Sequence, residues 1–239
     1  MGGCRYRNPL SDMAFQMTPA DPYVIANWYK IEEVGAPVKI YIEGDGAAFD
    51  RKGQPTENPT PTSTFMRELA AGDPSPNVVY LARPCQYVQN GCDVSDWTDG
   101  RFSEAVVHSM DRAVAAVMKK ARTNQAILIG FSGGAQIAGL IAVRHPERIR
   151  KLITVAGVLD PQAWTDYHGD QPLTKSLNLK NYRQVLQSVP QIHYVGDRDT
   201  VVPADLIRDF AGEETVVVVK GAGHGTGLEP VYREIYEVK

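Results

Sequence analysis

The sequence predicts a single α/β domain spanning residues 1–239, with a mostly parallel central sheet and helices on both faces. Short apolar runs that suit buried strands alternate along the chain with longer segments whose apolar residues recur at helical spacing. The composition, 43% hydrophobic and 22% charged, is that of an ordinary globular protein, and the length allows a substantial core. These two observations together favour one α/β domain.

The individual elements follow from local patterns. Strands are expected at short runs of β-branched and other apolar residues, namely residues 38–42, 77–82, 126–129, 151–156, 191–196 and 216–219. Helices are expected at longer amphipathic or apolar segments, namely residues 63–71, 102–122 and 135–143. Residues 53–62 are expected to form a turn-rich loop, and the regular alternation breaks between residues 157 and 190.

A glycine-flanked serine, Gly130-Phe131-Ser132-Gly133-Gly134, separates the strand at 126–129 from the helix at 135–143. A serine at such a tight turn is held in a strained, exposed position. Side chains in place of the glycines would collide with the neighbouring strand and helix. The helix start also offers unpaired N–H groups and a positive dipole end beneath the serine. Ser132 is therefore the candidate nucleophile, with a purely structural turn serine as the alternative.

Two later strands end in motifs that supply partners for this serine. The strand at 191–196 runs into Asp197-Arg198-Asp199-Thr200-Val201-Val202-Pro203, and the strand at 216–219 is followed by Gly221-Ala222-Gly223-His224-Gly225. Nucleophile, acid and histidine in this order, each after a strand, is the chain order of the Ser–Asp–His triad in α/β-hydrolases.

On these motifs the chain resembles the α/β-hydrolase superfamily from about residue 38 to its C-terminus. The resemblance implies the α/β-hydrolase fold. The Gly-x-x-Asp-x-Val-Val-Pro pattern is similar to the acid turn of the family and implies Asp199 as the acid, while Gly-Ala-Gly-His resembles its histidine loop and implies His224. Residues 41–46 and 82–87 also resemble a poorly characterised group of bacterial envelope α/β-hydrolases.

Each assignment has a competitor. Asp197 lies earlier in the acid turn, where an aspartate readily binds its own turn backbone. Four other histidines fall within a helix, within a strand, at a helix end or in the irregular segment: His108, His193, His145 and His168. Only His224 lies in a glycine-rich loop directly after a strand, where its imidazole can turn toward Ser132.

The resemblance also implies an oxyanion hole made from two backbone N–H groups. One comes from Gly133, the residue after the nucleophile, and the other from the loop after the strand at 38–42. Gly44 permits the tight backbone there, so Asp45 N–H is the candidate second donor. Glu43 stands where a histidine is common in the family and is expected to brace the loop as an acceptor. Both carboxylates are expected to point away, to bind water or basic partners, or to be partly protonated.

Residues 157–190 occupy the place where the family often carries a lid or cap, and they are expected to cover the site only in part. Phe131 and Gly44, together with Trp164 and Tyr167 of this segment, are the candidate substrate-binding residues. Trp164 has a structural alternative, in which it only packs the segment onto the domain.

The charge balance bears on partners. A formal net charge of −3 and a sequence pI near 6.0 argue against nucleic acid or an anionic membrane as the main partner. The chain has no metal-ligand cluster of useful spacing, so neither a metal nor another cofactor is expected. A small-molecule ester is the expected substrate.

The three cysteines favour a bacterial envelope, periplasmic or secreted location. Cys85 and Cys92 bracket a short polar loop that a disulfide can close, the alternative being two buried free thiols. Cys4 follows Gly2-Gly3, which resembles the end of a bacterial lipoprotein signal, so a lipid anchor at Cys4 and an N-terminal tether over residues 1–12 are expected.

Together these residues predict a serine hydrolase that cleaves a carboxylic ester or thioester through an acyl-enzyme intermediate. A peptidase or an acyltransferase on the same three residues ranks second. A non-catalytic envelope binding protein that retains the fold is the alternative from a different functional class.

Overall fold

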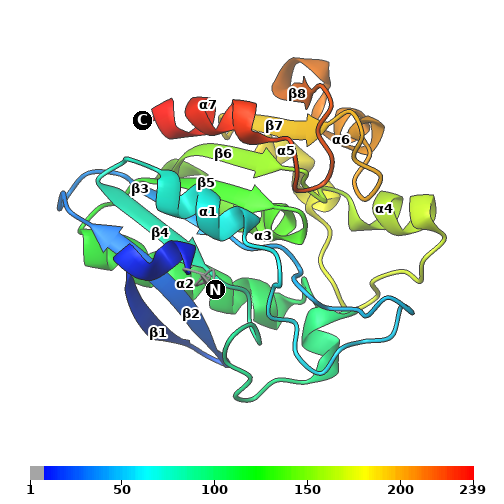
Figure 1. Cartoon of the computed structure of the whole chain (residues 1–239), viewed down its shortest axis with the longest axis horizontal. Helices are drawn as coiled ribbons and strands as arrows, with labels where there is room; N and C mark the ends of the chain where they lie inside the picture. The colour runs from blue at the N-terminus through cyan, green and yellow to red at the C-terminus, as the bar shows by residue number, and fades with distance from the viewer. Residues whose placement is uncertain (1–7) are drawn as a thin grey trace, which may run out of the picture.

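The central sheet has eight strands in the order β1-β2-β4-β3-β5-β6-β7-β8, in a computed structural model that describes residues 8–239. β1, β2 and β4 pair antiparallel, and every other neighbouring pair is parallel. Figure 1 shows β1 and β8 at opposite edges of this sheet. The predicted mostly parallel α/β fold is confirmed.

The secondary structure keeps the predicted alternation. The strands are β1 (Ala14–Ala20), β2 (Tyr23–Ile31), β3 (Val38–Ile42), β4 (Asn77–Leu81), β5 (Ala126–Phe131), β6 (Ile149–Val155), β7 (Gln191–Gly196) and β8 (Val216–Val219). The α-helices are α1 (Phe65–Gly72), α2 (Glu104–Ala121), α3 (Gly133–Arg144), α4 (Pro161–His168), α5 (Arg183–Leu186), α6 (Ala204–Ala211) and α7 (Tyr232–Glu237). The short 3-10 helices are η1 (Pro9–Asp12), η2 (Val94–Trp97), η3 (Pro146–Arg148), η4 (Leu179–Tyr182), η5 (Glu213–Thr215) and η6 (Glu229–Val231).

Helices cover both faces of the sheet. One apolar cluster joins the sheet to α2, α3 and α6, and a second joins it to α1 and α7, which lie in front of the sheet in Figure 1. The apolar side chains of β3 and β5 are buried on both faces, as expected for central parallel strands. This burial fixes the strand ends, and with them the carboxyl edge from which the site is built.

The N-terminal part of the described chain differs from the predicted tether. Residues 9–12 form η1, and Leu10 is fully buried against the domain. The tether prediction is therefore wrong for these residues, because an apolar side chain anchors them. Residues 1–7, including Cys4 and its predicted lipid anchor, lie outside the described residues. None of the helices within residues 8–239 has the length and apolarity needed to cross a bilayer.

A buried lysine on β3 attaches the C-terminal helix to the sheet. Lys39 Nζ lies 3.2 Å from Asp73 Oδ2, and it donates to the carbonyl oxygens of Ile235 at 3.0 Å and Tyr236 at 2.7 Å. Tyr41 donates a further hydrogen bond to the same Asp73 carboxylate. A buried ammonium is tolerated only when it is paired and hydrogen-bonded, as it is here.

Candidate active site

Ser132 stands at the turn between β5 and α3, at the carboxyl edge of the sheet. Its φ of 51° and ψ of −123° lie in a region that non-glycine residues rarely occupy. Backbone hydrogen bonds hold it there: Ser132 N–H donates to Val155 at 3.1 Å, and Ser132 C=O accepts from Val158 at 3.0 Å. The strained turn predicted from the sequence is confirmed.

Close backbone approach explains two of the flanking glycines. A Cβ atom on Gly130 would lie 2.6 Å from the Cα of Ala135, in the helix that follows. A Cβ atom on Gly134 would lie 2.5 Å from the carbonyl oxygen of Ile42, at the end of β3. Backbone atoms cannot swing aside as a flexible side chain can, so both positions exclude a larger residue. Substitution of either glycine would therefore cause the predicted collisions with the neighbouring strand and helix.

Ser132, His224 and Asp199 form one hydrogen-bonded chain. His224 Nε2 lies 3.0 Å from Ser132 Oγ, and His224 Nδ1 lies 2.9 Å from Asp199 Oδ2. The other oxygen of the buried Asp199 side chain accepts from the N–H groups of Val201 at 2.9 Å and Val202 at 2.8 Å. The imidazole is thus held between a hydroxyl and a carboxylate whose orientation is fixed by the backbone.

The competing residues lie elsewhere. Asp197 Oδ1 accepts from Gly221 N–H at 2.6 Å and braces the acid turn against the histidine loop. The histidines His145, His168 and His193 bind Asp111, the Val201 carbonyl and Thr154 respectively. His108 is exposed on α2.

The turn after β3 lies directly beside Ser132. Glu43 is buried, and its Oε1 accepts from Gly44 N–H at 2.9 Å, which is the predicted bracing role. Burial raises the pKa of the Glu43 carboxyl, although hydrogen bonds from Tyr80 and Gly44 oppose the shift. Among the described residues, the backbone N–H groups of Asp45 and Gly133 have no hydrogen-bond partner. Both are therefore available to an acceptor in the pocket.

The Asp45 carboxylate binds two arginines. Asp45 Oδ1 lies 3.1 Å from Arg83 Nη1, and Asp45 Oδ2 lies 2.8 Å from Arg101 Nη1. Burial alone would raise the pKa of this carboxyl, but the two guanidinium groups outweigh it and lower the pKa below its ordinary value. A Cβ atom on Gly133 would lie 2.0 Å from Asp45 Oδ1, so glycine is also needed at this position. The sequence left open whether the Asp45 carboxylate points away, binds water or basic partners, or is partly protonated. In the structure it binds basic partners.

Three side chains from β4 and the loop after it hold this turn, and we call Tyr80, Arg83 and Gln86 the β4 clamp. Tyr80 OH donates to Glu43 Oε2 at 2.7 Å, and Gln86 Nε2 donates to the Gly44 carbonyl at 2.9 Å. Arg83 supplies the ion pair to Asp45, and Gln86 Oε1 accepts from Arg83 N–H at 2.9 Å. Each residue from 43 to 45 therefore has its own anchor in the β4 clamp.

A disulfide closes the loop that carries the β4 clamp. Cys85 and Cys92 are bonded, as predicted, with Cα atoms 5.9 Å apart. Cys85 and Tyr87 both have positive φ, at 71° and 63°, so the loop is tightly wound around Gln86. Within residues 8–239, the two sulfurs and the Asp96 carboxylate are close enough together to be considered as metal ligands. The disulfide, however, leaves no thiolate for a metal.

A pocket of about 400 Å³ opens above Ser132, and we call it the inner pocket. Its lining comes from the turn after β3, the loop at residues 48–63, the serine and histidine turns, and α4. The side chains that line it include Phe49, Arg101, Phe131, Val158, Trp164 and Val201. Its volume is in the range of small-molecule sites.

The predicted substrate-binding residues fall into two groups. Gly44, Phe131 and Trp164 line the inner pocket, and the Phe131 ring lies 5.1 Å from the His224 ring. Tyr167 does not line it and is 59% exposed, so its placement in the pocket was wrong. Tyr167 lies one turn further along α4 than Trp164, beyond the residues that line the pocket.

Sequence reasoning missed three side chains around the pocket. Arg83 follows the end of β4 at the carboxyl edge, and that position was a usable signal. Arg101 and Phe49 lie in irregular segments without periodicity, where no local pattern indicates direction. Both come to the site through tertiary contacts alone.

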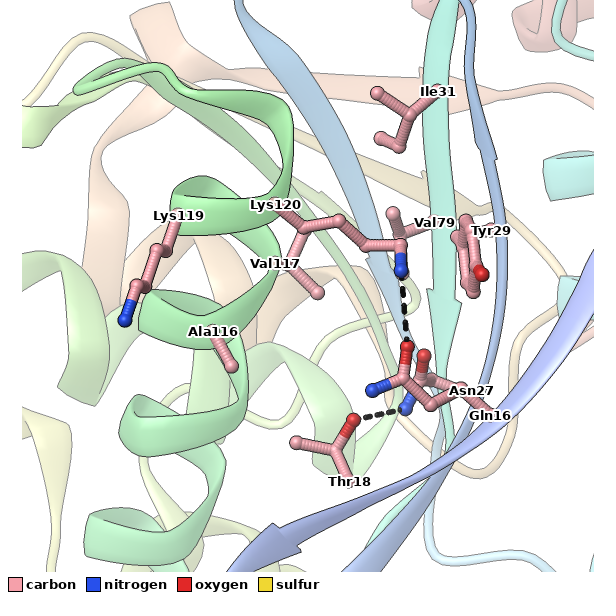
Figure 2. Close-up of a pocket in the computed structure, with 10 residues that line it drawn as sticks. All are labelled: Gln16, Thr18, Asn27, Tyr29, Ile31, Val79, Ala116, Val117, Lys119 and Lys120. Atoms are coloured by element: carbon pink, nitrogen blue, oxygen red, sulfur yellow. Dashed lines mark hydrogen bonds between the residues drawn. The ribbon is translucent and has the colours of Figure 1, made fainter.

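Another pocket, between α2 and the β1–β2 hairpin, is shown in Figure 2. Its polar contacts are one exposed pair, in which Lys120 Nζ donates to Gln16 at 3.3 Å, and one buried pair, in which Asn27 Nδ2 donates to Thr18 at 2.7 Å. None of Ser132, Asp199 and His224 lines this pocket. It offers neither a nucleophile nor an acid–base pair, so the candidate site is the inner pocket.

Comparisons with known proteins agree with this geometry. The family model described as "Serine hydrolase (FSH1)" matches residues 76–225. A pimeloyl-[acyl-carrier protein] methyl ester esterase from Yersinia enterocolitica is 37% identical over 73 residues, which is 30% of this chain and 28% of that protein. The structure of Est1E from Butyrivibrio proteoclasticus superposes with a TM-score of 0.66 at 13% identity, covering 93% of this chain and 96% of that one. An alpha-beta serine hydrolase homologue from Coxiella burnetii gives 0.57 at 18% identity, with 94% of each chain covered. These structures share the α/β-hydrolase fold.

Proposed function

Because the chain belongs to the serine hydrolase (FSH1) family, we propose that it hydrolyses a carboxylic ester through an acyl-enzyme intermediate formed on Ser132. The observation that carries the proposal is the hydrogen-bonded chain from Ser132 Oγ through His224 to Asp199, at 3.0 Å and 2.9 Å. Those distances are within the range in which a base can take a proton from a hydroxyl and a carboxylate can orient the base.

The reaction then runs in two steps. Ser132 Oγ attacks the ester carbonyl while its proton passes to His224 Nε2. When the tetrahedral intermediate collapses, the C–O bond to the alcohol breaks, and His224 returns the proton to the leaving oxygen. Water repeats the sequence on the acyl-enzyme, releasing the acid. Throughout, the Asp199 carboxylate stabilises the imidazolium and holds the tautomer with a proton on Nδ1.

The oxyanion that forms in each step accepts hydrogen bonds from the N–H groups of Gly133 and Asp45. Two observations support this assignment: neither N–H has a partner within residues 8–239, and both adjoin Ser132 in the fold. Losing one such donor typically costs about 3 kcal/mol of transition-state stabilisation. The Arg83 and Arg101 guanidinium groups neutralise the Asp45 carboxylate, which would otherwise repel the oxyanion.

The inner pocket favours a small, uncharged acyl group. Phe131, Val158 and Val201 give it apolar walls, which suit an uncharged acyl group because burying a charge against them would cost its hydration. A pocket of about 400 Å³ holds a short acyl chain together with part of the alcohol. We therefore place esters of short neutral acids first among substrates, with thioesters of the same acids next.

Fluorophosphonate labelling tests the proposal directly. The expected result is stoichiometric labelling of the wild-type protein at Ser132, no labelling of Ser132→Ala, and turnover of p-nitrophenyl acetate that the same substitution abolishes. A folded protein that neither labels nor turns over any ester, thioester or amide would overturn the proposal and leave a binding protein. Hydroxylamine trapping of an acyl group without release of free acid would instead identify an acyltransferase.

We also propose that the protein works in an oxidising compartment such as the bacterial envelope. The Cys85–Cys92 disulfide supports this, because such bonds persist mainly outside reducing compartments. Alkylation of both cysteines in cells before lysis would contradict it, whereas protection from alkylation that is lost on reduction is the expected result.

A further inference from the structure

A second pocket adjoins the inner one, and we call it the outer pocket. It has a volume of about 500 Å³ and is lined from two sides. One side is residues 98–101, which precede α2, and the other is α4 with the segment at residues 170–173. Three side chains line both pockets, namely Phe49, Arg101 and Trp164, and we call them the shared wall.

The shared wall is held in place by its own contacts. Arg101 Nε donates to the Thr98 carbonyl at 2.6 Å, and Arg101 Nη1 is bound to Asp45. The guanidinium carbon of Arg101 lies 5.4 Å from the centre of the Phe49 ring and 6.0 Å from that of Trp164. The Trp164 indole N–H donates to the Val201 carbonyl at 2.7 Å, so the indole presents apolar surface rather than a donor to the pockets. A substrate that reaches past Ser132 thus meets preformed aromatic surface.

The charged groups around the outer pocket are mostly paired with one another. Arg101 lies over both aromatic rings, where a cationic ligand would otherwise bind, and Lys175 Nζ lies 3.4 Å from Asp99 Oδ2. The Arg101 guanidinium therefore occupies the aromatic faces that a cationic ligand would use. An anion is disfavoured by the carboxylates of Asp99 and Asp170.

Hydrogen-bonding capacity is nevertheless available there. Among the residues that the structure describes, the Asp170 carboxylate and the Gln171 amide are exposed and have no side-chain partner, and both line the outer pocket. Together they offer acceptors for several hydroxyl groups and a donor from the amide. Aromatic surface beside such groups suits a ring or chain that has an apolar face and hydroxyl edges.

We infer that the outer pocket binds a neutral, hydroxyl-rich group of the substrate, such as a sugar or polyol, while the ester bond lies at Ser132. The inference rests on the proposed function and names the class of ester that the same site prefers. The hydroxyl-rich group is either the alcohol or the acid half of the ester. In both cases Asp170 and Gln171 accept its hydroxyl hydrogens, and Trp164 and Phe49 lie against its apolar face.

Two matched substrate pairs test the inference and separate the two halves. For the alcohol half, the pair is a monoacetylated methyl glucoside and cyclohexyl acetate. For the acid half, it is ethyl gluconate and ethyl hexanoate. The expected result in one pair is a kcat/KM at least tenfold higher for the hydroxylated ester. In the double variant Asp170→Asn, Gln171→Ala that preference falls about tenfold, whereas the exposed control Asp209→Asn keeps it.

The outcomes are distinct. If the double variant keeps the wild-type preference, or if neither hydroxylated ester is preferred while the plain esters are cleaved, the inference is overturned and the proposed function stands. If no ester is cleaved and no fluorophosphonate label is taken up, the proposed function fails. In that case, titration of Ser132→Ala protein with methyl glucoside by NMR decides the outer pocket: shifts that saturate and depend on Asp170 and Gln171 support it, and their absence overturns it.

Discussion

Asp199 presents one carboxylate oxygen to His224 Nδ1, at 2.9 Å, and the other to two backbone N–H groups of its own turn. The carboxylate is therefore fixed before any substrate arrives. Any rotation of the carboxylate would break the bonds to the backbone, and in its present orientation it already binds the imidazole.

This relationship predicts the effect of Asp199→Asn. The amide keeps the size of the side chain but removes the anion, and it favours the wrong imidazole tautomer, so kcat should fall by about three to four orders of magnitude. Steady-state kinetics on p-nitrophenyl acetate measures the loss, and circular dichroism checks that the fold is retained. Asp197→Asn is the matched control, because its side-chain oxygen can still accept from Gly221, and it should lose less than tenfold. Reversed magnitudes would mean that the acid is Asp197.

The β4 clamp yields a second prediction. Gln86→Met keeps the length of the side chain but removes its hydrogen bonds to the Gly44 carbonyl and from Arg83 N–H, which frees the turn that carries Asp45 N–H. We expect kcat to fall about 10- to 100-fold with little change in KM, because an oxyanion donor acts in the transition state. Gln89→Met alters an exposed glutamine of the same loop, bound to the Glu57 carbonyl, and should keep kcat within twofold. A rise in KM alone would show that Gln86 acts on substrate binding.

The disulfide gives a third prediction, which concerns stability and activity together. In the chain-entropy model a loop this short contributes about 2–3 kcal/mol to the free energy of unfolding. Chemical denaturation with and without a reductant should show a loss of this order, together with a fall in kcat, since Arg83 and Gln86 flank Cys85. The double variant Cys85→Ser, Cys92→Ser should reproduce both effects and be insensitive to reductant. Free thiols in the denatured, non-reduced wild type would disprove the bond.

A buried histidine predicts how stability depends on pH. His193 is fully buried on β7, bound to Thr154 at 2.8 Å and Gln191 at 3.0 Å, and burial lowers its pKa to about 4. The unfolded chain binds a proton near pH 6.5, and the folded chain does so only near pH 4. The free energy of unfolding should therefore be highest above pH 6.5 and fall by about 3 kcal/mol as the pH drops to 4.

His193→Gln should flatten that slope, because glutamine does not titrate and can still bind Thr154. Urea denaturation at pH 4, 5, 6 and 7 measures the slope for both proteins. His108→Gln, at an exposed position on α2, should leave it as in the wild type. Parallel wild-type and His193→Gln curves would show that other groups control the acid limb.

The sequence was most informative where chemistry and local geometry coincide. A serine between glycines, between a strand and a helix, specified the φ of Ser132 because few residue types tolerate that turn. His224 and Asp199 were identified from their order after two later strands and from the resemblance of their loops to those of α/β-hydrolases. The β1–β2 hairpin was not predicted: residues 13–37 received no element, although β1 alternates between exposed and buried positions at its C-terminal end.

The features that escaped prediction depend on contacts distant in sequence. Arg101 pairs with Asp45 across 56 residues, and Trp97 of η2 donates to the Thr56 carbonyl. Neither contact produces a periodic pattern in the sequence. Tyr167 failed for a different reason: the segment was correctly placed beside the site, but Tyr167 lies one turn further along α4 than Trp164, and the sequence does not indicate how far along the helix the pocket extends.

The Lys39 ammonium has a consequence for where the polypeptide can be cut. Its acceptors on α7 are main-chain carbonyls, so substitution of the side chains of Ile235 or Tyr236 leaves them in place. Truncation, by contrast, removes these carbonyls. In a chain ending before residue 235, the buried Lys39 ammonium would keep only Asp73 as a partner. The final helix therefore completes the solvation of an internal charge, and an expression boundary drawn to trim it would remove part of the core.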